Sequence, residues 1–230
     1  MHRWESAMKR GCFVTGTDTG VGKSFAAVAL LHALRRDGGP AVGMKPVASG
    51  SVRTPQGWRN EDALALQAAS APRPDYLLVN PYALPEPTAP QIASALAGVR
   101  VELPTLLAAH SALAGMAGGR VVVEGVGGWL APLADGLEQS ELVRAIDLPV
   151  VLVVGLKLGC LNHARLTARA ITADGCRLAG WIGNAVEPPG PHSDAYLGLL
   201  RAALPAPCLG LLPYAPGADP ADLALNLSAD

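Results

Sequence analysis

The sequence carries little charge, and its positive and negative charges are balanced. Of the 230 residues, 18 are Lys or Arg and 19 are Asp or Glu, which gives a formal net charge of −1. A chain without excess positive charge has no overall field to attract nucleic acid or an anionic membrane. We therefore expect no nucleic-acid partner and no membrane partner, and a small-molecule ligand is favoured.

Long hydrophobic runs are also missing. The longest apolar stretch, VVLVVGL at 150–156, is far shorter than the roughly 20 residues of a membrane-spanning helix. The opening residues, MHRWESAMKR, carry charge with no apolar segment behind them, unlike a secretory signal. We expect no membrane helix, an N-terminal extension over residues 1–10, and a cytoplasmic protein.

Cysteine and aromatic residues are scarce. The four cysteines are Cys12, Cys160, Cys176 and Cys208. They show no CxxC pair and no metal-ligand spacing, and each lies in or beside apolar sequence, which predicts buried reduced thiols. The histidines form no HExxH motif, so no histidine-based metal site is predicted.

Half of the residues are hydrophobic, enough to bury a substantial core in one domain. Short β-branched runs alternate with Ala- and Leu-rich segments of helical spacing. Strands are predicted at 12–16, 41–45, 75–80, 120–125, 149–155, 177–184 and 208–213, and helices at 23–36, 61–70, 102–116, 138–146, 161–173 and 192–203. Runs that are apolar at every position indicate strands covered on both faces, hence an α/β fold with a mostly parallel central sheet of about seven strands flanked by helices.

Residues 16–24, GTDTGVGKS, join the first predicted strand to the first predicted helix. Backbone N–H groups of such a turn can bind phosphate, while Lys23 adds a positive charge and Ser24 a hydroxyl ligand for Mg²⁺. Five residues separate Gly16 from Gly22, one more than in the common P-loop pattern, so an ordinary Gly-rich turn is the alternative. The context favours a P-loop, and we predict a single P-loop NTPase-like domain over 11–230.

Three further charged residues lie at or after predicted strand ends. In parallel sheets, ligands bind at the carboxyl ends of the strands. Glu124 ends the strand 120–125, where a carboxylate linked to Mg²⁺ is typical of P-loop proteins, although a strand-end acid can also cap a turn. Lys45 ends the strand 41–45 and either faces phosphate or is a solvated surface charge. Asp62 follows the predicted N-cap Asn60 and either complements the helix dipole or faces the same Mg²⁺.

In these motifs the sequence resembles the dethiobiotin synthetases, ATP-dependent enzymes that close the ureido ring in biotin biosynthesis. The likeness covers nearly all of residues 12–214 in order, and the five-residue spacing in the P-loop is typical of that family. The blocks that carry it include FVTGTDTGVGKS, GMKPVASGS, VNPYALPEPTAP, VVVEGVGGWLAPL and PVVLVVGLKLGCLNHARLTA.

The resemblance implies an ATP- and Mg²⁺-dependent cyclo-ligase that converts 7,8-diaminopelargonate and CO2 to dethiobiotin, ADP and phosphate. One amine captures CO2 as a carbamate, ATP phosphorylates the carbamate oxygen, and the second amine attacks the mixed anhydride. A carbamate anion approaching a γ-phosphoryl group brings negative charges together, so fixed cations are the main catalytic need. The family is homodimeric, with the diamine site near the subunit interface, so residues 158–162 would act on the partner's substrate.

The resemblance also assigns residues. Lys45 and Lys23 would be catalytic, and Ser24, Asp62 and Glu124 would hold Mg²⁺. The nucleotide would be bound by Thr19, Gly20, Val21, Gly22, Lys23, Ser24, Phe25, Asp62, Glu124, Gly125, Val126, Gly127, Asn184, Ala185, Pro213, Tyr214 and Ala215. The substrate would be bound by Ser49, Pro81, Tyr82, Gly127, Leu158, Gly159, Cys160 and Asn162.

The sequence departs from the family pattern in places and leaves two other classes open. Gly20 stands where some members carry an acid, and Gln91 where many carry His. An amidoligase-type ATPase would normally add a glutaminase domain, for which 230 residues leave no room. A P-loop switch ATPase would carry its signature lysine at the position of Asp18.

Overall fold

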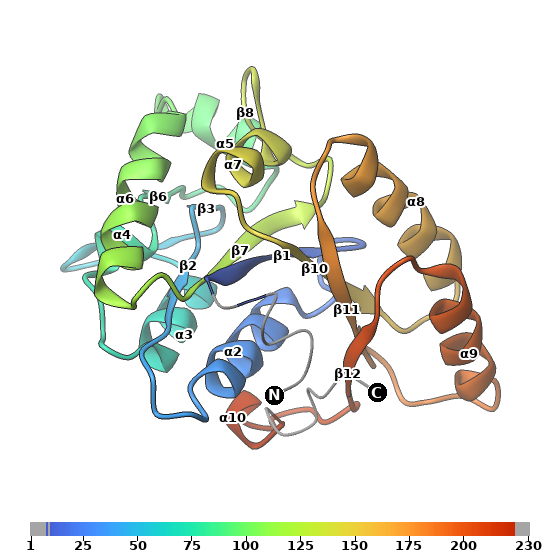
Figure 1. Ribbon diagram of the computed structural model, residues 1–230. Helices are drawn as coiled ribbons and strands as arrows, with labels where there is room; N and C mark the ends of the chain where they lie inside the picture. The colour runs from blue at the N-terminus through green and yellow to red at the C-terminus, as the bar shows by residue number, and fades with distance from the viewer. Residues whose placement is uncertain (1–7, 9, 224–230) are drawn as a thin grey trace.

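The computed structural model describes Met8 and residues 10–223, and its centre is a parallel β-sheet (Figure 1). In the described residues this sheet has six strands in the order β12-β11-β10-β1-β7-β2. The strands are β1 (Gly11–Gly16), β2 (Val42–Met44), β7 (Val121–Gly128), β10 (Val150–Gly155), β11 (Leu178–Asn184) and β12 (Cys208–Leu212). Every neighbouring pair is parallel, so the α/β fold predicted from the sequence is confirmed.

Helices cover both faces of this sheet (Figure 1). One face carries α2 (Lys23–Leu34), α3 (Glu61–Ala69) and α10 (Pro220–Leu223); the other carries α5 (Pro90–Ala97), α6 (Leu103–Met116), α7 (Gln139–Ile146), α8 (Cys160–Ala173) and α9 (Ser193–Ala203). Successive strand residues point to opposite faces, so Val14 packs under α2 whereas Phe13 packs in the core beneath α6 and α7. Strands that are apolar throughout follow from this double cover.

Within residues 10–223, three small two-stranded sheets accompany the main one. They are β3 (Val47–Ala48) with β6 (Tyr82–Ala83), β4 (Val52–Thr54) with β5 (Gly57–Arg59), and β8 (Pro132–Ala134) with β9 (Leu137–Glu138). Strand β3 follows shortly after Lys45, so the chain leaves the carboxyl end of β2 through the small β3–β6 sheet.

The prediction of a strand at 75–80 is wrong. This segment forms a short helix, α4 (Tyr76–Val79), which begins where the Asp75 side chain accepts a hydrogen bond from the backbone N–H of Leu77 at 2.7 Å. Leu77 is 65% exposed, so the apolar run does not need cover on both faces. The sheet has one strand fewer than expected for this reason.

The predicted N-terminal extension falls mostly outside the described residues. Of residues 1–10, only Met8 and Arg10 are described, and Met8 is fully buried in the core beside α2. All four cysteines are buried, as predicted, and burial raises the pKa of Cys12 to about 12. No helix in the described part of the chain is long and apolar enough to cross a bilayer.

Candidate active site

The loop between β1 and α2 is held in a conformation that requires glycine. Gly22 has a φ of +83°, and a Cβ at this position would collide with the side-chain nitrogen of Asn184. That same nitrogen donates to the backbone carbonyl of Val21 at 2.9 Å, so the end of β11 anchors the loop. Glycine at position 22 is thus required both by backbone conformation and by the approach of Asn184.

A cavity of about 710 Å³, here called the P-loop cavity, opens at the carboxyl edge of the sheet. Its lining includes eleven of the residues assigned by resemblance: Thr19, Gly20, Gly22, Lys23, Ser24, Lys45, Ser49, Asp62, Glu124, Val126 and Gly127. These residues come from four separated segments of the chain, and the parallel sheet brings three of these segments together because β7 lies between β1 and β2.

Lys45 lies at the centre of a buried charge cluster. Its ammonium donates to Glu124 Oε1 at 2.5 Å, to Asp62 Oδ2 at 3.0 Å and to the carbonyl of Gly125 at 3.3 Å. Ser24 Oγ donates to the same Glu124 oxygen at 2.8 Å. Lys45 is 4% exposed and Glu124 1% exposed, so the alternatives of a solvated lysine and a turn-capping acid do not apply.

The cluster shifts the pKa of its members. Burial opposes charge on Lys45, but the carboxylates of Glu124 and Asp62 outweigh it and raise the pKa of the ammonium. Burial raises the pKa of Glu124, while the Lys45 ammonium opposes this rise. Burial lowers the pKa of Lys23 to about 8, and the positive charge of Lys45 adds to this effect. Lys45 is therefore a protonated, fixed positive charge.

The same groups suit a magnesium ion. Glu124 Oε2 is buried and has no hydrogen-bond partner among the described residues. No cluster of three or more His, Cys, Asp or Glu occurs in the described part of the chain, but Mg²⁺ at nucleotide sites needs only one or two carboxylates beside phosphate oxygens and water. A hydroxyl and two carboxylates, from Ser24, Asp62 and Glu124, meet that requirement.

A second cavity, here called the β11–β12 cavity, has a volume of about 720 Å³. Its lining includes Leu158, Cys160, Ala185, Pro213 and Tyr214, which are residues assigned by resemblance to the adenine and to the substrate. Ala215 lies next to this lining and is half-buried, Gly159 is the N-cap of α8, and Asn162 is exposed. The predicted base-binding residues therefore follow β11 and β12, and Asn184 joins them to the P-loop.

Nine of the assigned residues are in the lining of neither cavity: Val21, Phe25, Pro81, Tyr82, Gly125, Gly159, Asn162, Asn184 and Ala215. Phe25 lies in α2 and packs against the core on that face of the sheet. Tyr82 directs its hydroxyl to the backbone N–H of Glu102, from which it accepts a hydrogen bond at 3.1 Å, and Pro81 beside it is half-buried. Gly125 is buried in β7 and contributes its carbonyl to Lys45.

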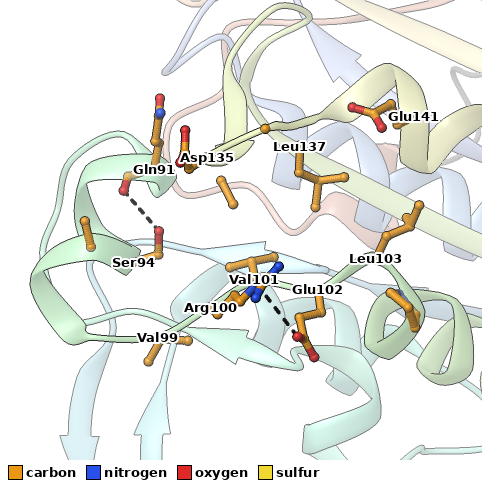
Figure 2. Close-up of a pocket in the computed structure, with 14 residues that line it drawn as sticks. Gln91, Ser94, Val99, Arg100, Val101, Glu102, Leu103, Asp135, Leu137 and Glu141 are labelled. Atoms are coloured by element: carbon orange, nitrogen blue, oxygen red, sulfur yellow. Dashed lines mark hydrogen bonds and ion pairs between the residues drawn. The ribbon is translucent and has the colours of Figure 1, made fainter.

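A third cavity of about 720 Å³ lies between α5 and the β8–β9 turn (Figure 2). Gln91 and Ser94 border it from α5, Asp135 from the turn between β8 and β9, and Glu141 from α7. None of the assigned site residues is in its described lining. Gln91, which departs from the family pattern, therefore faces this cavity and not the charge cluster.

Gln139 is a residue of the site that the sequence did not reveal. It is fully buried at the start of α7. Its side-chain oxygen accepts from the N–H of Val126 at 3.0 Å, and its nitrogen donates to the carbonyls of Gly128 at 2.7 Å and Trp129 at 3.2 Å. Gln139 thus fixes the Gly-rich segment after Glu124, and a polar residue at a helix start gives no signal of such a distant contact.

Comparison with known proteins identifies the family of this chain. A family model described as an AAA domain matches residues 10–222. The ATP-dependent dethiobiotin synthetase BioD of Xanthomonas euvesicatoria pv. vesicatoria (strain 85-10) is 59% identical over 94% of this chain and 96% of its own. The protein of the same name from Xylella fastidiosa (strain 9a5c) is 58% identical over 94% of this chain and 95% of its own.

Solved structures share the fold at much lower identity. A ParA family ATPase from Chlorobium tepidum TLS matches with a TM-score of 0.55 and 14% identity over 95% of this chain and 91% of its own. The MinC:MinD cell division protein complex of Aquifex aeolicus matches with a TM-score of 0.55 and 13% identity over 93% of this chain and 85% of its own. These likenesses confirm the P-loop architecture, and the close sequence relatives show that the chain belongs to the ATP-dependent dethiobiotin synthetase family.

Proposed function

We propose that this protein is an ATP- and Mg²⁺-dependent cyclo-ligase that forms dethiobiotin from 7,8-diaminopelargonate and CO2, with release of ADP and phosphate. The observation that carries the proposal is the P-loop cavity, in which two buried lysines, Lys23 and Lys45, lie beside Ser24 and two carboxylates. The names of relatives that are 57–59% identical over nearly the whole chain support the same activity.

The lysines meet the electrostatic demand of the reaction. Lys23 begins α2, where it and the free N–H groups of the first helical turn bind phosphate oxygens. Lys45 keeps its proton because Glu124 and Asp62 raise its pKa, so it acts as a fixed charge between the carbamate and the γ-phosphoryl group and not as a base. Mg²⁺ held by Ser24, Asp62 and Glu124 would neutralise charge on the phosphates.

Ser49 is the proposed contact of the carbamate. It lines the P-loop cavity, and its hydroxyl oxygen is buried with no hydrogen-bond partner among the described residues. A buried hydroxyl is rarely left unpaired, so a ligand oxygen at this position would satisfy it.

The proposal includes a homodimer in which residues 158–162 reach the partner's substrate. Leu158 is 84% exposed, and it borders the β11–β12 cavity. Leu158 is therefore accessible to a second subunit directly before α8.

The test is phosphate release with Mg-ATP and bicarbonate, measured with and without 7,8-diaminopelargonate, while mass spectrometry follows the organic product. We expect phosphate release that depends on the diamine and yields one dethiobiotin per ATP. Hydrolysis that does not depend on the diamine would instead support a switch ATPase, and phosphate release without the ring-closed product would overturn the proposal.

A further inference from the structure

Three buried polar residues beside the P-loop cavity hold the main chain of Lys45, Ser49 and Tyr82 and the start of the helix that carries Asp62. They are Asn60, Tyr76 and Asn80, which are 8%, 6% and 1% exposed. Buried polar side chains are hydrogen-bonded in stable proteins, and here the partners of all three lie in the segments that carry Lys45, Ser49, Asp62 and Tyr82.

Asn80 holds the end of β2. Its side-chain nitrogen donates to the carbonyl of Lys45 at 2.7 Å and to the carbonyl of Tyr82 at 3.2 Å. The backbone N–H of Lys45 donates to the carbonyl of Val79 at 2.7 Å. Both main-chain polar groups of Lys45 are thus bonded to the end of α4, which fixes the point from which its side chain extends.

Asn60 holds the start of α3. Its side-chain oxygen accepts from the N–H of Ala63 at 3.3 Å, as an N-cap does, and its nitrogen donates to the carbonyl of Ser49 at 3.2 Å. Asp62 lies in the first turn of this helix. The position of the Asp62 carboxylate therefore depends on where Asn60 places the helix start.

The Tyr76 hydroxyl joins the two arms. It accepts from the backbone N–H of Asn60 at 2.8 Å and donates to Asn80 Oδ1 at 3.0 Å. The guanidinium of Arg59 lies 4.1 Å from the centre of the Tyr76 ring, which holds the ring in place. One hydroxyl thus connects the helix start that carries Asp62 to the strand end that carries Lys45. The Lys45 ammonium and Asp62 Oδ2 are 3.0 Å apart.

We propose that Tyr76 is a positioning residue that sets the relative placement of Lys45 and Asp62 through Asn80 and Asn60. The choice of Lys45 and Asp62 as the groups that matter rests on the proposed function, whereas the hydrogen-bonded link does not. In this arrangement Tyr76 acts through its two neighbours and touches no substrate. Its removal loosens the geometry of the charge cluster and leaves the P-loop unchanged.

The test compares Tyr76→Phe, which keeps the ring and its contact with Arg59 but removes the hydroxyl, with the wild type. We expect a fall in kcat of about ten-fold, since small displacements of catalytic groups are costly. We also expect several-fold weaker binding of Mg-ATP by calorimetry, with unchanged binding of ATP in EDTA. The matched control is Gln67→Met, which removes another buried hydrogen bond near α4, from Gln67 to the carbonyl of Pro74 at 2.9 Å, without touching the link.

A double-mutant cycle separates positioning from general loss of stability. The cycle adds Asn80→Ala and the double variant that combines it with Tyr76→Phe. We expect the double variant to lower kcat by less than the product of the two single effects, because both substitutions break the same link. Independent effects, or an equal loss of kcat in Gln67→Met, would overturn the inference. The calorimetric arm needs no diamine, so it tests the link even if the wild type forms no dethiobiotin.

Discussion

At the scale of single residues, the charge on Lys45 is the feature most directly tied to the proposed chemistry. Its ammonium is buried between Glu124 and Asp62. Lys45→Met is expected to lower kcat at least about 100-fold, roughly the effect of removing one contact that stabilises charge in the transition state. ATP should still bind, because the P-loop is intact, and calorimetry beside steady-state kinetics measures both quantities.

A second variant keeps this prediction specific. Lys45→Arg retains the charge but replaces a compact ammonium with a planar guanidinium, so its kcat should lie between those of the wild type and Lys45→Met. Thermal unfolding of both variants checks that they are folded. Wild-type turnover in Lys45→Met would contradict a catalytic role for the charge.

The glycines of the P-loop allow a matched comparison. Gly20 and Gly22 both have positive φ, at +75° and +83°, but a Cβ at Gly20 meets nothing within 4 Å, whereas one at Gly22 collides with Asn184. Gly20→Ala should lower the free energy of unfolding by about 1 kcal/mol from backbone strain alone. Gly22→Ala should cost about 2–3 kcal/mol and weaken ATP binding, because Asn184 must move. Urea unfolding and ATP titration test this, and equal effects of the two substitutions would show that the Asn184 contact is unimportant.

At the scale of elements, periodicity predicted the six strands of the central sheet and helices α2, α3, α6, α7, α8 and α9. It did not predict α5 or the short strands of the small sheets, and it failed at 75–80, where a side chain caps a turn. The apolar residues of 75–80 suggested a strand, yet the Asp75 side chain starts a helix there. This helix also carries Tyr76 and precedes Asn80, the residues that hold Lys45 and Asn60. A single sequence contains the cap residue but not the long-range hydrogen bonds that decide between a helix and a strand.

Helix α6 carries a buried histidine whose titration should affect stability. The His110 Nε2 is buried without a partner among the described residues, and burial, followed by the positive charge of Arg10, lowers its pKa. As the pH falls through about 6.5, the unfolded chain takes up the proton before the folded protein does, so the free energy of unfolding decreases. His110→Gln should show a shallower decrease between pH 7 and about 5.5.

The measurement is chemical unfolding of the wild type and His110→Gln at a series of pH values. Comparing the two slopes cancels the contribution of the carboxylates, which both proteins share. Parallel pH profiles would mean that His110 binds its proton equally in the folded and unfolded states.

At the scale of the whole molecule, the parallel sheet explains why so much of the site could be predicted. In such sheets ligand groups gather at the carboxyl ends of the strands, and Lys45, Glu124 and Ala185 lie in or directly after strands that meet at this edge. The supporting contacts of Gln139, Tyr76 and Asn80 could not be predicted, because each joins segments whose relative positions only the folded chain defines.

The last prediction concerns the surface through which the proposed dimer would form. Leu158 is 84% exposed before α8, whereas Leu77 is 65% exposed on α4, which packs beside β2 at the opposite edge of the sheet. Leu158→Asp should shift the protein from dimer to monomer in sedimentation velocity, because a buried charge opposes association. It should also raise the KM for the diamine, because in the proposed dimer residues 158–162 would reach the partner's substrate.

Leu77→Asp introduces the same charge far from the proposed interface, so it should leave both the sedimentation coefficient and the KM unchanged. A Leu158→Asp protein that remains dimeric with an unchanged KM would place the interface elsewhere. A monomer with an unchanged KM would instead separate the two parts of the proposal, since the surface would then serve association while each subunit completed its own substrate site.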